Sequence, residues 1–285
     1  MGLRELVRSV EKLEPLDAVA DWVAPKVTAV LGRPALKDIL SGVWVGHPLH
    51  PLLTDVTIGT WASAFLLDMV GGEDARDAAE TLIGIGLISA VPTAASGLSD
   101  WSDTVGPERR LGLVHAMTNI AALKLYAASW TLRKVGRHRS GVALGSLGAA
   151  LLTAGGYLGG HLAYARGIGV DHTVFDEPPQ EWQIAAADED VAEGVVTVGT
   201  AAGYGVLLYR FNGAVHAIAD RCSHAGGPLH EGEVDDRLCV TCPWHSSTFR
   251  LSDGSIVRGP ATAPQRAFDV RIRNGNVEVR ARDAR

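Results

Sequence analysis

The chain contains little cysteine: three of its 285 residues, at positions 222, 239 and 242. Three thiols cannot form the disulfide framework that holds many small secreted domains together. Two of them are better explained as metal ligands, because each lies two or three residues before a histidine. The near absence of cysteine therefore excludes a disulfide-stabilised scaffold and fits a reducing compartment.

A surplus of positive charge is also missing. Lys and Arg number 26 against 32 Asp and Glu, which gives a formal net charge of −6, so nucleic acid is not expected as a partner. Residues 1–40 lack the uninterrupted apolar core of a secretory signal, so no such signal is expected. A chain of this length most naturally forms two domains.

Apolar side chains, in contrast, are abundant: they make up 47% of the chain and concentrate in four stretches between His50 and Arg166. Each stretch is close to the roughly 20 residues that a helix needs to cross a bilayer. The fourth has no Asp, Glu, Lys or Arg, and its glycines follow the small-xxx-small spacing that lets helices approach closely in lipid. A soluble bundle would need polar faces at helical period, so we expect membrane-spanning helices. The stretches are 51–70, 81–98, 111–132 and 141–164.

We therefore predict an α + β multidomain protein, with an N-terminal four-helix transmembrane bundle followed by a C-terminal all-β domain. Leu3, Leu6 and Val10 recur at helical spacing near the N-terminus and indicate an amphipathic helix. This helix would lie on the membrane surface or pack on the C-terminal domain. The expected boundaries are 1–45 for this helical segment, 46–166 for the transmembrane domain, 167–180 for a linker and 181–285 for the β domain.

The C-terminal part contains two Cys-His pairs, Cys222-Ser-His224 and Cys242-Pro-Trp-His245, with seventeen residues between them. Two thiolates on one iron and two imidazoles on the other form the ligand set of a Rieske [2Fe–2S] centre. Zinc also takes two Cys and two His, but zinc fingers usually space them as C-x-x-C and H-x-x-x-H. The interleaved pairs therefore favour the cluster, and Cys239 is expected to be a buried thiol beside it.

From about Glu181 to Arg282 the chain resembles a Rieske domain of the ferredoxin type. The resemblance rests on the two Cys-His pairs with the residues that follow each, on Asp253-Gly, and on Gly259-Pro-Ala. It implies that two ligand loops at the tips of hairpins clamp the cluster. It also implies that a third loop near Gly259 covers the cluster and that the two histidines face solvent.

The chain departs from the high-potential members of that family. Gly227 and Trp244 stand where those members carry a disulfide, and Phe249 stands where they carry a tyrosine. Ser246 replaces the usual glycine after the second histidine, while Ser247 keeps a hydroxyl that could donate to a cluster sulfur. Fewer donors to sulfur favour a lower potential, so we expect one like that of a ferredoxin.

Residues 46–61, which begin Gly-His-Pro-Leu-His-Pro, resemble a family of uncharacterised bacterial four-helix membrane proteins. That family is grouped with small membrane cytochromes, so the resemblance implies haem b as a candidate cofactor. With four spans, His50, His115 and His161 would lie at one depth, near the side of the β domain. His115 and His161 are the expected haem ligands, with His50 as the substitute. A small metal site, a quinone pocket and a purely structural role remain as alternatives.

Two charged residues within the apolar stretches, Asp68 and Lys124, are expected to form a structural pair.

These features predict a membrane-anchored electron-transfer protein that uses a Rieske cluster. It would pass through the bacterial cytoplasmic membrane several times, with the Rieske domain on the cytoplasmic side. Its partners would be a redox partner protein or quinone, together with membrane lipid. The alternatives are a ferredoxin component for a separate Rieske oxygenase and a redox sensor without turnover. No catalytic residue is assigned, and the chain would act as an electron carrier or as an oxidoreductase subunit.

Overall fold

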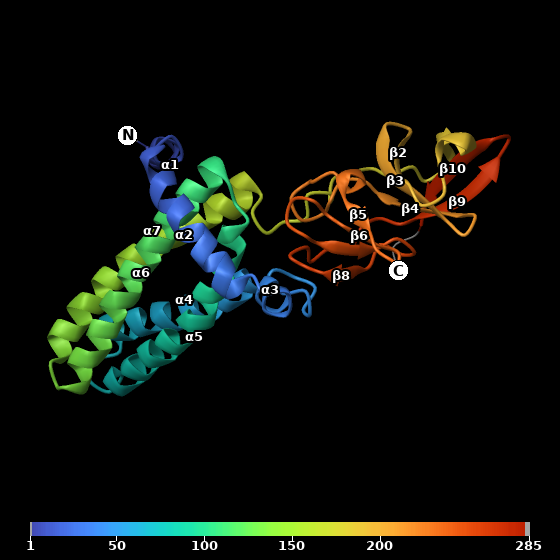
Figure 1. The fold of residues 1–285 in the computed structure, drawn as a ribbon. Coiled ribbons are helices and arrows are strands. Elements are labelled where there is room, and N and C mark those ends of the chain that lie inside the picture. Colours follow the sequence, from blue (N-terminus) through green and yellow to red (C-terminus); the bar gives the residue numbers. More distant parts are fainter. Residues whose placement is uncertain (1, 283–285) are drawn as a thin grey trace. The chain divides into compact units, whose positions relative to one another are not determined.

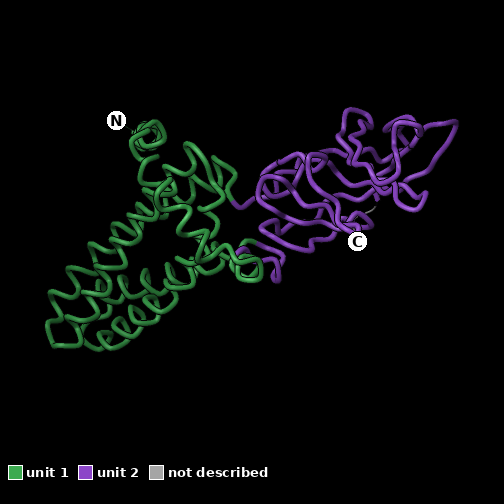
Figure 2. Tube along the Cα trace, in the orientation of Figure 1, with its two compact units in different colours: residues 1–40, 48–168 green, residues 41–47, 169–285 purple. Residues whose placement is uncertain are grey.

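The computed structural model describes residues 2–282, which divide into two compact units (Figure 2). The helical unit comprises residues 1–40 and 48–168, and the β unit comprises residues 41–47 and 169–285. All long helices lie in the first unit and all strands in the second (Figure 1), so the expected α + β class is confirmed.

Within the part of the chain that the structure describes there are seven helices, so the expected count of four was wrong. The four longest contain the four apolar stretches, and three shorter helices precede them because residues 1–45 fold as several elements. Proline begins α2, and Gly167 ends α7 in a left-handed conformation (φ 72°), as such residues commonly do. The helices are α1 (Leu3–Glu11), α2 (Pro15–Leu31), α3 (Pro34–Ser41), α4 (Leu49–Val70), α5 (Arg76–Ser102), α6 (Gly106–Lys134) and α7 (His138–Arg166).

Three of these helices, α5, α6 and α7, are long and apolar enough to cross a membrane. Helix α4 has 22 residues, with Asp55, Asp68 and three threonines along it, and is not among these three. It nevertheless packs along α5, just as α6 packs along α7. In Figure 1 the α4–α5 and α6–α7 connections lie at one end of the helical unit and α1 lies at the other.

Glycines of α7 provide its contact with α6. The buried residues of α7 are all glycine, and a Cβ at Gly148 would lie 3.0 Å from the Tyr126 ring of α6. At Gly155 it would lie 2.5 Å from Asn119 Oδ1. The small residues therefore let the two helices approach closely, as the small-xxx-small spacing predicts. The buried glycines are Gly141, Gly145, Gly148 and Gly155.

A buried ion pair joins α4 to α6. Arg133 donates from Nη1 to Asp68 Oδ1 at 2.8 Å and from Nη2 to Oδ2 at 2.5 Å, and both side chains are almost fully buried. The prediction that Lys124 pairs with Asp68 was wrong. Asp68 pairs with Arg133 instead, because the planar guanidinium engages both carboxylate oxygens at once.

The β unit consists of three antiparallel sheets with strand orders β1-β10-β9, β2-β3-β4 and β5-β6-β7-β8. Most strands are linked to their neighbours in sequence, and β1 closes the first sheet against β10. The strands are β1 (Gln183–Ala187), β2 (Val196–Ala201), β3 (Tyr204–Phe211), β4 (Ala214–Ala219), β5 (Glu233–Val234), β6 (Cys239–Thr241), β7 (Thr248–Arg250), β8 (Ile256–Arg258), β9 (Phe268–Arg273) and β10 (Asn276–Ala281).

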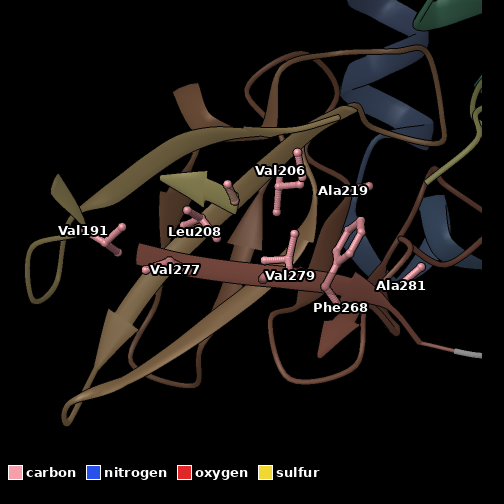
Figure 3. Packing of buried hydrophobic residues seen from close by; sticks show 11 residues of the cluster. Val191, Val206, Leu208, Ala219, Phe268, Val277, Val279 and Ala281 are labelled. Carbon is pink, nitrogen blue, oxygen red and sulfur yellow. The ribbon is translucent and has the colours of Figure 1, made fainter. Parts of the chain in front are cut away.

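Strand β3 is buried on both faces. The core on one of these faces also contains residues of the third sheet, which is thereby held against β3. Val206 and Leu208 point into one core with Phe268 and Val279 (Figure 3), while the alternate residue Leu207 enters a second core. Because successive side chains of a strand point to opposite faces, β3 separates the two cores. The second core also contains Cys222 and Cys242, so the ligand loops rest directly on packed apolar side chains.

Candidate metal centre

Two loops present the predicted ligands, and their backbones are closed in the same way. Cys222 N–H donates to the carbonyl of Gly227 at 2.8 Å, and its own carbonyl accepts from Gly226 N–H at 2.8 Å. In the second loop, Cys242 N–H donates to Ser247 O at 2.8 Å and Cys242 O accepts from Ser246 N–H at 3.1 Å. Each cysteine is thereby held by its own loop before any metal binds.

The residue that closes each loop is in the left-handed region. Gly226 has φ 78° and Ser246 has φ 62°. Glycine adopts this conformation at no steric cost, whereas a residue with a side chain is disfavoured there by about 1–2 kcal/mol. The departure from glycine at Ser246 therefore places a strained residue in the second ligand loop.

The four predicted ligands come together in two layers. Cys222 and Cys242 are 1% and 3% exposed, and their thiols share a hydrogen bond. His224 and His245 are half-buried, with ring centroids 5.0 Å apart and an interplanar angle of 86°. The thiols therefore lie on the core side and the imidazoles on the outer side of the site.

The contact between the thiols changes their acidity. The shared hydrogen bond and burial raise the pKa of the Cys222 thiol. The same hydrogen bond, assisted by backbone N–H groups of the second loop, lowers the pKa of Cys242 to about 6. Cys242 is thus the more acidic of the two thiols, and metal binding requires that both lose their protons.

A third loop is tied to both ligand loops by serine hydroxyls. Ser247 Oγ accepts from Ala261 N–H at 2.9 Å, so its own hydroxyl proton remains available to a neighbouring acceptor. Ser223 Oγ donates to the carbonyl of Ala263 at 2.7 Å. The sequence pointed to Ser247 but not to Ser223, because a serine between two ligands carries no signal of what it reaches forty residues later.

Trp244 occupies the space that a disulfide would need. A Cβ built on Gly227 would lie 3.0 Å from the Trp244 ring and 3.1 Å from Cys242 Sγ. The indole therefore packs against the glycine beside the thiolates, and it remains 55% exposed. Cys239 is buried on β6, where its thiol contacts the carbonyl of Arg237 at 3.6 Å.

This arrangement fits two irons better than one zinc ion. Among residues 2–282, no three His, Cys, Asp or Glu side chains are placed to hold a single metal ion. A binuclear cluster, by contrast, needs a thiol pair and a separate imidazole pair. The residues present provide those two pairs in adjacent layers, with a hydroxyl proton at Ser247 for a sulfur atom.

The histidines of the helical unit are arranged differently from the expectation. His50 on α4 and His115 on α6 are neighbours, with ring centroids 6.4 Å apart. His161 lies 3.3 Å from Glu11 Oε1. The structure thus places His50, the expected substitute, beside His115, and the ligand roles of all three remain a prediction.

Each ring of this pair is fixed by a backbone carbonyl. His50 Nδ1 lies 2.9 Å from Thr93 O, and His115 Nδ1 lies 2.9 Å from Gly155 O. A carbonyl only accepts, so in each neutral ring Nδ1 carries the proton and Nε2 keeps its lone pair. Glycines make room for the rings: a Cβ would lie 2.6 Å from His50 at Gly97 and 3.0 Å from His115 at Gly159.

An all-β unit that presents two such loops defines an iron–sulfur protein with mixed Cys and His ligation. Residues 181–271 match the model of the Rieske [2Fe–2S] domain, and residues 46–172 match that of a predicted membrane protein family, DUF2231. The chain belongs to the Rieske [2Fe–2S] family and joins its domain to one of that membrane family.

Relatives of the β unit include ferredoxins. It is 34% identical over 74 residues to the 3-phenylpropionate/cinnamic acid dioxygenase ferredoxin subunits of Photorhabdus laumondii and Escherichia coli K12, covering 26% of this chain and 70% of each relative. A human Rieske domain-containing protein is 34% identical over 91 residues, 58% of its length. The solved ferredoxin of carbazole 1,9a-dioxygenase from Nocardioides aromaticivorans is 30% identical, with a TM-score of 0.33 over 35% of this chain and 96% of that one. The family match and the ferredoxin subunits support the [2Fe–2S] cluster, and they give no support to haem.

Proposed function

We propose that this protein is a membrane-anchored electron carrier that exchanges electrons between its Rieske domain and a site among the helices. The observation that carries the proposal is the pairing of two buried thiols with two half-buried imidazoles on tied loops. A bound [2Fe–2S] cluster would supply one-electron chemistry at this site. Cys222 and Cys242 would hold the inner iron, and His224 and His245 the outer one.

The chain's own residues would set the properties of that centre. The Ser247 hydroxyl would donate to a sulfur, whereas Phe249 is fully buried and offers no donor. The exposed Trp244 beside His245 would form part of the surface that a partner contacts, since their ring centroids are 6.4 Å apart. With one hydroxyl donor, the potential would be that of a ferredoxin rather than of a quinol-oxidising centre.

His50 and His115 are the proposed electron site of the helical unit. Both rings keep an Nε2 lone pair, that of His115 facing the amide nitrogen of Asn119 at 3.3 Å, and the rings are held within the bundle by carbonyls and glycine gaps. Such a pair could ligate a haem iron or hydrogen-bond the oxygen of a quinone head group. His161 is bound to Glu11 and would take no part in binding either a haem or a quinone.

The arrangement in the membrane is also part of the proposal. Residues 46–166 would form a multi-pass anchor, followed by the linker 167–180 and the Rieske domain 181–285. The ion pair between Glu11 and Arg166 (2.6 Å) supports a common side for α1 and the end of α7. The free cysteines favour the cytoplasmic side for the Rieske domain.

The second candidate is a ferredoxin component that serves a separate oxygenase. It is favoured by the dioxygenase ferredoxin subunits among the relatives of the β unit. Under this candidate the electron would leave for a soluble partner, and the helices would only hold the carrier at the membrane. A redox sensor without turnover would exchange electrons with neither partner at a useful rate.

A reoxidation experiment distinguishes these candidates. The full chain in detergent is reduced with dithionite, its Rieske-type paramagnetic signal is recorded, and the decay of that signal is followed after adding a short-chain quinone. We expect fast decay in the natural protein, slower decay by about tenfold or more in His115→Gln, and no change in the control His161→Gln. A pyridine-haemochrome assay on the same sample separates haem from quinone.

Two outcomes would contradict the proposal. A sample that contains zinc and gives no paramagnetic signal would exclude the cluster. If the decay rate of the signal does not change when quinone is added, but rises with a soluble Rieske oxygenase, the ferredoxin component would be favoured.

A further inference from the structure

A basic pocket lies at one end of the helical unit, between the first helix and the end of the last. Its volume is about 290 Å³, and it is open to solvent. The lining residues come from α1 and α7: Arg4, Arg8, Glu11, His161, Ala165 and Arg166. Three guanidinium groups and one carboxylate thus face the same space, which leaves the pocket with a surplus of positive charge.

The carboxylate is already engaged. Arg166 donates from Nε to Glu11 Oε1 at 2.9 Å and from Nη2 to Oε2 at 2.6 Å, and His161 Nε2 lies 3.3 Å from Oε1. Burial raises the pKa of Glu11, but its hydrogen bonds and the charge of Arg166 outweigh this and hold that pKa below its usual range. Glu11 therefore stays ionised and, together with Glu108, whose Oε1 lies 3.5 Å from Arg166 Nη1, compensates Arg166 rather than Arg4 or Arg8.

Arg4 and Arg8 have no such compensation. Across residues 2–282, neither forms an ion pair, whereas Arg109 and Arg110 at the same end of the unit pair with Asp21 and Asp17. Arg4 and Arg8 are four residues apart on one helix, a spacing at which like charges repel. Two unpaired guanidinium groups beside a third form a site for an anion with several oxygens, such as a phosphate.

The surroundings of the pocket indicate where that phosphate comes from. Leu3 and Leu6 on α1 are 63% and 50% exposed, as in a helix that lies in a membrane interface. Tyr164, next to the pocket near the end of the apolar helix α7, is 93% exposed. Exposed tyrosines at the ends of spanning helices are typical of the headgroup level of a bilayer.

We infer that this pocket binds the phosphate of an anionic phospholipid, with Arg4 and Arg8 as the donors and α1 resting on the lipid surface. The surplus positive charge selects a lipid with net negative charge over a zwitterionic one. The inference requires the helical unit to be in a membrane but does not depend on electron transfer, so the two can fail separately.

The test counts lipids on the intact chain. The delipidated holoprotein in detergent is titrated with phosphatidylglycerol or with phosphatidylcholine, and bound lipids are counted by native mass spectrometry. We expect one site that prefers phosphatidylglycerol. In Arg4→Gln/Arg8→Gln the affinity should fall by about 30-fold, the effect of removing two basic residues near a membrane surface.

The matched control is Arg137→Gln/Arg139→Gln, which removes two arginines at the opposite end of α7. These also lack an ion pair within the described chain, so general charge effects should be equal, and the preferred site should persist. Persistence of that site in the Arg4/Arg8 variant would overturn the inference. So would its displacement by millimolar inorganic phosphate, which would identify a soluble anion. If the variant does not fold, equal binding of the two lipids by the natural protein is sufficient to reject the inference.

Discussion

The two units hold their histidines in different ways. In the β unit, His224 and His245 stand on short loops whose backbones close on themselves, two or three residues from the cysteines. In the helical unit, His50 and His115 come from different helices and are held by carbonyls of two further helices. The first arrangement is local and depends on loop geometry, whereas the second is tertiary and depends on how four helices pack.

This difference predicts which changes each site tolerates. A local site should lose its cofactor when a ligand is removed but keep its fold. A tertiary site should respond to packing changes remote from any ligand, because small residues on neighbouring helices create its space.

The largest expected effect is on the local site. Cys222→Ser should abolish cluster binding, because serine cannot supply the thiolate that iron requires. Iron and acid-labile sulfide measured on the purified chain would both fall to background. The control is Cys239→Ser, which alters a buried thiol outside the ligand pairs and should keep the full complement. Retention of iron by Cys222→Ser would contradict the ligand assignment.

The next effect tests the packing of the helical unit. Arg133→Met leaves Asp68 buried without a partner and should destabilise the helical unit by about 3–5 kcal/mol. Its neighbour provides the control: Lys134→Met breaks the exposed pair with Glu80 and should change stability by less than about 1 kcal/mol. Unfolding in detergent, followed by circular dichroism, measures both, and equal effects would refute the importance of burial.

A glycine exchange tests the histidine pair directly. Gly97→Ala would bring a Cβ to 2.6 Å from His50 and should cost about 1–3 kcal/mol through overpacking. Gly156→Ala has nothing within 4 Å and should instead stabilise its helix by up to about 1 kcal/mol. Opposite signs in the same unfolding assay are expected. A stabilising Gly97→Ala would show that the ring moves aside freely.

The smallest effect concerns the strained loop. Ser246→Gly should stabilise the β unit by about 1 kcal/mol, because glycine adopts a φ of 62° without strain. The reverse exchange in the matching loop, Gly226→Ser, should destabilise it by a similar amount. Thermal unfolding of both variants, with the cluster bound, compares the two loops. Equal stability of Ser246→Gly and the natural chain would show that Ser246 is not strained.

Local signals explain what could be predicted from the sequence. The α + β class, the four apolar stretches and the Cys-His pairs all appear as short patterns, and each lies in one helix or one loop of the structure. The ligand residues came together because loop closure needs only the six residues of each loop.

Long-range contacts explain what was missed. No residue near His115 in the sequence indicates that His50 of α4 lies beside it, and Gly97, which makes room for His50, lies on a third helix. Asp68 pairs with Arg133 because α4 and α6 are aligned so that these two residues lie at the same level. Apolar periodicity does not specify that alignment. Residues 1–45 formed three helices rather than one amphipathic segment, since breaks at Pro15 and Pro34 mattered more than the periodicity before them.

The serine ties between the three loops of the β unit have a consequence for speed. Ser223 and Ser247 connect both ligand loops to residues 261–263, so a shift of one loop would have to break or carry along these hydrogen bonds. When the charge at such a centre changes by one electron, its surroundings have little freedom to rearrange. With a cluster bound, such ties would lower the reorganisation energy, so an electron would need only a small driving force to move in either direction.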